Sequence, residues 1–161
     1  MCGGFFLRRN HMKPNEAMQA ALNEAKKAYE IDEVPIGCVI LHQGEVIARA
    51  HNQKEIDQKA CSHAEILAIS QANEYFKHWR LNDCTLVVTL EPCMMCAGAI
   101  AQARIPYVVY GASDSKFGAY GGCFDSTLIR GLNHYPKLTS GVLADQSIEL
   151  LQSFFESKRK R

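Results

Sequence analysis

The segment Thr85-Leu86-Val87-Val88-Thr89-Leu90-Glu91-Pro92-Cys93-Met94-Met95-Cys96 decides the fold of this 161-residue chain. Its first half is a nearly unbroken run of β-branched and aliphatic residues, which is typical of a central strand covered on both faces. Its second half begins a helix that we expect over residues 91–104, with Pro92 in the first turn, where a missing N–H has no partner to lose. A buried strand therefore leads directly into a helix that carries two thiols near its start.

Strands and helices alternate on both sides of this segment. The turn His42-Gln43-Gly44-Glu45 joins two short apolar runs and predicts an antiparallel hairpin. Segments 52–61 and 111–136 are polar or glycine-rich without a regular period, and a loop as long as the second is usually functional. Apolar spacing predicts helices over 15–29, 62–76 and 147–158, and strands over 38–41, 46–50, 106–110 and 138–143. This order predicts an α/β chain with a layered sheet.

Length and composition are those of one ordinary globular domain. Apolar residues make up 47% and charged residues 22% of the chain, which argues against disorder. The apolar runs are strand-sized, far short of the ~20 residues that a membrane span needs. We expect residues 1–13 to be a disordered arm or a non-native extension and residues 14–161 to form the domain. A net charge of +1 neither favours nor excludes nucleic acid, so an RNA site would depend on local groups.

The chain has seven cysteines, an odd number at irregular spacings, and no secretory signal precedes them. A disulfide framework is therefore not expected, and a reducing cytoplasm fits better. Five of the cysteines are interpreted as unpaired thiols that mostly serve as small apolar core residues. They are Cys2, Cys38, Cys61, Cys84 and Cys123.

The other two cysteines, Cys93 and Cys96, lie three residues apart and share one face of the predicted helix. Alone, such a pair could equally be a redox dithiol or half of a structural zinc site. His63 adds an imidazole at the start of another predicted helix, and helix N-termini stabilise the thiolates that zinc binds. One imidazole and two thiolates leave the fourth tetrahedral position free for water. We therefore predict that His63, Cys93 and Cys96 bind a catalytic zinc ion.

Glu65 has two interpretations. Ser62 to Glu65 matches the S-x-x-E capping box, in which Glu65 would bond back to the Ser62 amide and take no part in chemistry. Beside a zinc ion, the same carboxylate would move protons. The combination of His63-Ala64-Glu65 with Pro92-Cys93-x-x-Cys96 is the signature of zinc deaminases that act on bases, in which the acidic residue is the general acid and base. We predict that Glu65 is catalytic.

From about Asn15 onward the chain resembles the bacterial tRNA-specific adenosine deaminases of the cytidine deaminase-like superfamily. The zinc ligands alone would identify only the superfamily. The long block 89–99 and the loop Asp114-x-Lys116-x-Gly118 favour the tRNA branch, although position 113 is Ser where family members often carry a basic residue. The matching blocks are Glu33-Val34-Pro35-Ile36-Gly37, Asn52, 62–66, 89–99, 111–119, 132–134 and 141–145.

The resemblance implies a three-layer α/β/α fold with a central mixed sheet of about five strands flanked by helices. It also implies zinc-dependent, hydrolytic deamination of adenosine to inosine at the wobble (first anticodon) position of tRNA, with an arginine tRNA as the expected substrate. One Zn²⁺ per subunit, no organic cofactor, a homodimer and a cytoplasmic enzyme without membrane contact follow from the same resemblance. Asn52 is expected to hydrogen-bond the flipped-out base. Asp114 and Lys116 are expected to contact a ribose and a phosphate of the anticodon stem-loop.

Some of these residues have simpler interpretations. Asn52 suits a turn, and Lys116 suits a solvated surface. His134 and Phe155 either line the RNA surface or pack within the domain. The basic end Lys158-Arg159-Lys160-Arg161 is either a frayed, solvated tail or a phosphate contact along the last helix.

Two other functions remain open on the sequence. A deaminase of a free base or nucleoside, such as guanine, cytosine or cytidine, would share the zinc site but would need neither the basic tail nor the nucleotide-contacting loop. A non-catalytic, zinc-stabilised RNA-binding module would close the coordination sphere of zinc with a fourth protein ligand and would give Glu65 no role.

Overall fold

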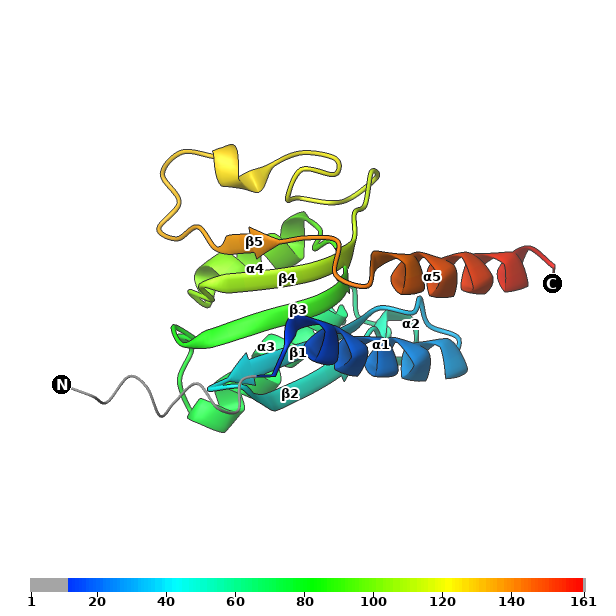
Figure 1. Cartoon of the computed structure of the whole chain (residues 1–161), viewed down its shortest axis with the longest axis horizontal. Coiled ribbons are helices and arrows are strands. Elements are labelled where there is room, and N and C mark those ends of the chain that lie inside the picture. Colours follow the sequence, from blue (N-terminus) through cyan, green and yellow to red (C-terminus); the bar gives the residue numbers. More distant parts are fainter. Residues whose placement is uncertain (1–11, 161) are drawn as a thin grey trace.

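The computed structural model describes residues 12–160, which form one five-stranded sheet with helices on both faces (Figure 1). The order of the strands across the sheet is β2-β1-β3-β4-β5. The helices are α1 (Pro14–Glu30), α2 (Lys54–Asp57), α3 (Ala64–Phe76), α4 (Met94–Gln102) and α5 (Ala144–Arg159), and a short 3-10 helix covers Ser126–Leu128. The strands are β1 (Gly37–His42), β2 (Glu45–His51), β3 (Cys84–Leu90), β4 (Tyr107–Ala112) and β5 (Lys137–Thr139).

The sheet is mixed, and β3 is its central strand as predicted. β1 runs antiparallel to both β2 and β3, whereas β4 runs parallel to β3 and to β5. This register places the start of β1, the end of β2 and the ends of β3 and β4 at the same end of the sheet. The loops that follow these strands therefore meet there, and so do the first turns of α3 and α4.

Alternate side chains of the central strands point to opposite faces of the sheet and pack in two separate hydrophobic cores. Leu86 and Val88 of β3 are buried in the larger core, to which α3 and α4 contribute. Val87, between them, is buried in the smaller core beneath α1. The helix α5 packs beside β4 on the α1 side, where the Tyr29 and Phe154 rings meet edge to face at a centroid distance of 5.6 Å. The three-layer α/β/α prediction is confirmed.

Most differences from the predicted elements lie at helix starts. The helix expected from residue 91 begins at Met94 with Cys93 at the N-cap, so Pro92 lies ahead of the first turn. The helix α5 begins at Ala144, three residues before the predicted start, and the last strand is only the three-residue β5. The polar segment 52–61 contains the short helix α2, whose four residues are too few to leave a periodic signal.

The cysteine prediction is half right. Cys38 and Cys84 are buried core residues, but Cys61 and Cys123 are exposed because they lie in the loops before α3 and after β4. Every cysteine among residues 12–160 is unpaired. Cys2 and most of the arm predicted at residues 1–13 fall on residues 1–11, which lie outside the described residues. Within residues 12–160, no helix has both the length and the apolarity needed to cross a bilayer.

Gly37 lets α1 approach the sheet closely. A Cβ atom at this position would lie 1.9 Å from the Ala21 carbonyl oxygen and 2.4 Å from the Ala25 amide nitrogen, both in the backbone of α1. We expect Gly37→Ala to reduce the free energy of unfolding by about 3 kcal/mol or more, because neither backbone can move without opening a core. Urea unfolding measures this. The matched control is Gly98→Ala in α4, where a Cβ would meet no atom within 4 Å and the helix should gain up to about 1 kcal/mol. Equal stabilities of the two variants would contradict this account.

Glu24 is a buried carboxylate that makes stability depend on pH. Its oxygens lie 2.9 Å from Lys27 Nζ and 3.0 Å from His51 Nδ1. Burial raises the pKa of Glu24, but the hydrogen bonds and charges of Lys27 and His51 outweigh burial and bring this pKa below its ordinary value of 4.5. The unfolded chain therefore takes up this proton first as the pH falls, so the contribution of Glu24 is complete above about pH 5 and decreases below pH 4.5. The stability difference between wild type and Glu24→Gln should shrink between pH 6 and pH 4 in urea unfolding; a constant difference would contradict this.

Candidate metal centre and active site

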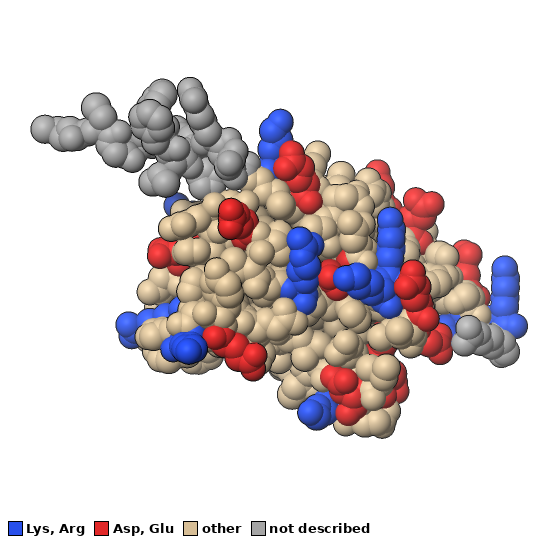
Figure 2. All heavy atoms as spheres, turned by 90° about the horizontal axis from the view of Figure 1, so that it is seen from below, with Lys and Arg blue, Asp and Glu red and all other residues tan. Residues whose placement is uncertain are grey.

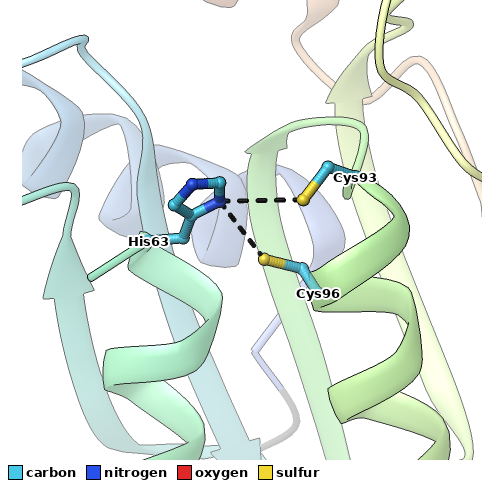
Figure 3. A group of neighbouring side chains, drawn as sticks. All are labelled: His63, Cys93 and Cys96. Atoms are coloured by element: carbon cyan, nitrogen blue, oxygen red, sulfur yellow. Dashed lines mark hydrogen bonds between the residues drawn. The ribbon is translucent and has the colours of Figure 1, made fainter. Parts of the chain in front are cut away.

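The three predicted zinc ligands converge from two helix starts. His63 is the N-cap residue of α3 and Cys93 is the N-cap residue of α4, with Cys96 in the following turn (Figure 3). The Nδ1 atom of His63 lies 3.7 Å from Cys93 Sγ and 3.5 Å from Cys96 Sγ. All three candidate donor atoms lie within 4.8 Å of one another. The structure thus also shows which imidazole nitrogen faces the thiols, a detail the sequence left open.

This group fits a zinc ion. Zn–N and Zn–S bonds of about 2.1 and 2.3 Å at a tetrahedral angle place nitrogen and sulfur about 3.6 Å apart, close to both distances observed. Among the described residues, this is the one group of three or more His, Cys, Asp or Glu side chains close enough to hold a metal ion, and it contains three residues. A fourth protein donor, as in a structural zinc site, is not part of it.

The pKa values of the two thiols shift in opposite directions. The hydrogen bond with the Cys96 thiol lowers the pKa of Cys93 to about 4, although burial acts in the opposite direction. The same interaction, together with burial, raises the pKa of Cys96. The Cys93 hydrogen bond also raises the pKa of His63. The site thus favours a thiolate at Cys93 and a thiol at Cys96, and a bound cation would displace the Cys96 proton to gain the second thiolate.

Glu65 lies beside this group and is not part of a capping box. The N-cap of α3 is His63 rather than Ser62 and makes no side-chain cap hydrogen bond, and the Ser62 amide donates to the Lys59 carbonyl, so the box does not form. Glu65 is 4% exposed, and burial raises its pKa although contact with Cys96 lowers it. A carboxyl group with a raised pKa can both accept and return a proton near neutral pH.

A cavity of about 990 Å³ opens over Glu65 and the His63/Cys93 pair, and it is lined by all three residues predicted to bind substrate. Asn52 follows β2 at the wall of the cavity and is nearly buried. Asp114 and Lys116 lie on the loop after β4. Asp114 Oδ1 accepts the amides of residues 116 and 117 at 2.9 and 3.2 Å, which closes a turn and leaves Oδ2 for other partners.

Sequence reasoning missed Glu91, which organises that loop. The carboxylate of Glu91 is buried at the end of β3 and accepts four hydrogen bonds from the loop. These bonds join Oε1 to Ser113 Oγ and the Asp114 amide, and Oε2 to the Tyr120 and Gly122 amides, at 2.8 to 3.1 Å. Burial raises the pKa of Glu91, but the four hydrogen bonds together lower this pKa by more than burial raises it, so the net shift is downward. One signal was available: an acidic residue directly after a buried strand needs buried partners.

Gly118 shows how tightly the loop closes on this carboxylate. A Cβ at Gly118 would lie 2.3 Å from Glu91 Oε2 and 2.5 Å from the Asp114 carbonyl oxygen. Only glycine allows this approach, which explains physically why the loop has the form Asp114-x-Lys116-x-Gly118.

The last helix contributes to the site in a way that its apolar pattern did not predict. Apolar spacing suits Ile148, Phe154 and Phe155 to the inner side of the helix, but Ile148 and Phe155 are 41% and 46% exposed, while Phe154 is buried against α1. Phe155 instead lines the cavity. Lys158 is helical rather than frayed, and its Nζ lies 2.5 Å from Asp32 of the α1–β1 turn. His134 does not line this cavity; its Nε2 lies 2.6 Å from the Ile105 carbonyl oxygen.

The mixed sheet and the His/Cys/Cys group define a deaminase of the cytidine deaminase-like class. A model of the MafB19-like deaminase family matches residues 12–159. The tRNA-specific adenosine deaminase of Streptococcus pyogenes serotype M1 is 47% identical over 144 residues, which cover 89% of this chain and 84% of that protein. The chain belongs to this family, that of the tRNA-specific adenosine deaminases.

Two solved structures separate the branches of the class. One, from a study of A-to-I editing by tRNA:A34 deaminases at the wobble position of transfer RNA, has a TM-score of 0.79 and 42% identity, covering 84% of this chain and 98% of that one. A guanine deaminase from Nitrosomonas europaea has a TM-score of 0.78 but only 25% identity, covering 91% of this chain and 86% of that one. The folds are equally similar, whereas the sequence is much closer to the tRNA enzyme.

Proposed function

We propose that this chain hydrolyses adenosine to inosine and ammonia at the wobble position of tRNA, with an arginine tRNA as substrate. The observation that carries the proposal is the open three-donor group of His63, Cys93 and Cys96 beside the buried carboxylate of Glu65, at the base of a large cavity. An open site favours catalysis over the zinc-stabilised binding module. The sequence identities favour tRNA over free guanine.

His63, Cys93 and Cys96 would hold one Zn²⁺, which when bound supplies Lewis acidity that lowers the pKa of water toward neutrality. Glu65 accepts the proton of the attacking water and delivers it to purine N1 as oxygen bonds to C6. It then takes the remaining hydroxyl proton and gives it to the 6-amino group. The C6–N6 bond breaks, ammonia leaves, and C6 keeps the oxygen as the carbonyl of inosine. One carboxylate serves both transfers because both occur at the same edge of the ring.

The surroundings of the cavity support a nucleic-acid substrate. A second cavity of about 580 Å³ shares six lining residues with the first, including Lys116 and Phe155, and adds Lys158 and Arg159. Cations next to an exposed aromatic ring suit phosphates and splayed-out bases. On the face seen in Figure 2, Lys and Arg are interspersed with Asp and Glu. Asn52, Asp114 and Lys116 are the proposed substrate contacts.

We also propose a homodimer, with one zinc ion in each 14–161 deaminase domain. Large apolar side chains are exposed on the loop between β4 and β5, where Leu128 is 77% and Ile129 is 49% exposed, and on α4, where Met94 is 71% exposed. Apolar surface of this kind supports association. Sedimentation velocity tests the dimer. A tRNA substrate and the unpaired cysteines among residues 12–160 both support a cytoplasmic enzyme, since thiols stay reduced there.

The deciding experiment incubates the purified protein with an arginine tRNA anticodon stem-loop that carries adenosine at the wobble position. Mass spectrometry should show a gain of inosine at that position and none at other adenosines. Free guanine, cytosine and cytidine are tested in parallel. Deamination of one of these with the stem-loop unchanged would overturn the proposal.

A further inference from the structure

Glu33 is a second buried carboxylate at the edge of the site that takes no part in metal binding or proton transfer. It lies in the turn between α1 and β1 and is 1% exposed. Its Oε1 accepts the Ile56 amide at 2.6 Å, and its Oε2 accepts Asn52 Nδ2 at 3.3 Å. Both contacts lead toward the cavity, since Asn52 lines it and Ile56 belongs to α2, whose Lys54 lines it.

A carboxylate can only accept hydrogen bonds, so Asn52 must turn its NH₂ group toward Glu33. Because the amide group is planar, its oxygen Oδ1 then points away from Glu33. Among the described residues, no donor contacts Asn52 Oδ1, and the one buried side-chain polar atom without a partner is Tyr120 Oη. Asn52 Oδ1 is therefore accessible. The hydrogen bond from Asn52 Nδ2 to Glu33 thus fixes which atom of the Asn52 amide is available to a base.

We propose that Glu33 is a positioning residue that fixes the orientation of the Asn52 amide and thereby determines which hydrogen-bonding edge of a base the site accepts. The inference rests on the proposed function, in which Asn52 contacts the flipped-out base. An amide that is free to rotate would present a donor in half of its orientations where the base needs an acceptor, and would bind more weakly.

Glu33→Gln tests this by reversing the amide of Asn52. The Ile56 N–H cannot turn around, so it keeps the oxygen of the substituted side chain as its acceptor, and the new NH₂ group at position 33 faces Asn52. Asn52 then rotates to offer Oδ1, which exchanges donor for acceptor at the base. We expect kcat/KM on the anticodon stem-loop to fall about 10- to 100-fold, mainly through KM. Glu24→Gln, the same change at a similarly buried carboxylate in α1 that does not line the cavity, should leave activity unchanged.

A double-mutant cycle separates positioning from mere structural support. If Glu33 acts through Asn52, Glu33→Gln should cause no further loss in an Asn52→Ala background. Additive losses, or an unchanged KM in Glu33→Gln alone, would overturn the inference while leaving the proposed function intact.

A stability measurement tests the same contact without activity. At pH 8, Asn52→Asp sets two carboxylates against each other and should lower Tm by about 5 °C or more. Adding Glu33→Gln should restore Tm, because the new amide at position 33 can donate to the new carboxylate at position 52, but it should not restore KM. An Asn52→Asp protein with the same Tm as wild type would overturn the inference. If wild type leaves the stem-loop unchanged, the proposed function fails and the Tm measurements decide the role of Glu33 alone.

Discussion

Glu65→Gln should lower the rate of inosine formation by about 10²–10⁴-fold or more, because the amide cannot carry protons from water to N1 and on to the leaving amine. The side chain keeps its shape, so the cavity and the His/Cys/Cys group should remain intact. Turnover of the anticodon stem-loop is followed by mass spectrometry. Zinc content by elemental analysis and folding by circular dichroism should both match those of wild type.

The matched control for this variant is Glu74→Gln. Glu74 is an exposed carboxylate on the same helix, α3, far from its first turn, and its loss should leave turnover unchanged. A fully active Glu65→Gln protein would remove the catalytic role of Glu65. A Glu65→Gln protein that had lost its zinc would instead show that the carboxylate supports the metal.

Cys93→Ser should abolish both zinc binding and activity. A serine hydroxyl stays protonated near neutral pH, so it cannot replace the thiolate whose pKa is lowered to about 4 in this site. Two remaining donors cannot hold a metal that needs three protein ligands. The zinc content measured by elemental analysis should fall from one zinc per chain to almost none. The Tm should fall as well, because a bound metal would link the first turns of α3 and α4.

Cys123→Ser is the matched control, since Cys123 is an exposed thiol on the loop after β4 and is not part of the ligand group. It should retain zinc, Tm and turnover. Chelation of the wild-type metal should abolish activity, and Zn²⁺ should restore it. The catalytic interpretation would fail if the native protein bound no zinc, or if X-ray absorption showed four protein donors around the ion.

Much of the candidate site was predictable because its signals are local. The His-x-Glu and Cys-x-x-Cys motifs each span no more than one helical turn. The first follows the polar segment 52–61 and the second follows the apolar strand 85–90, so both motifs are at predicted helix starts. The spacing of three residues places Cys93 and Cys96 on one side of their helix. His63 and Glu65 are only two residues apart, and they meet at the site because His63 is the N-cap of α3, with extended backbone. The central position of β3 was equally local, because a continuous apolar strand must be covered on both faces.

The rest depended on partners that are distant in the sequence. Glu33 reaches residues 52 and 56, and Glu91 reaches residues 113–122, across separations that no local pattern records. The capping box was a local match that did not form. Ser62 and Glu65 have the right spacing, but α3 has His63 at its N-cap and the Ser62 amide donates to the Lys59 carbonyl. Phe155 has the right helical spacing for a core residue, yet α5 turns it toward the cavity.

The sequence by itself determined the order of the main elements, the chemistry of the three candidate metal donors and the acidic residue beside them, because these follow from spacing and residue type. Only the tertiary structure decided which buried carboxylates hold the loops around the cavity, which nitrogen of His63 faces the thiols and which way the Asn52 amide points. The physical reason is that a hydrogen bond has a direction and a partner. Both are set only when strands that are distant in the sequence come into register at one end of the sheet.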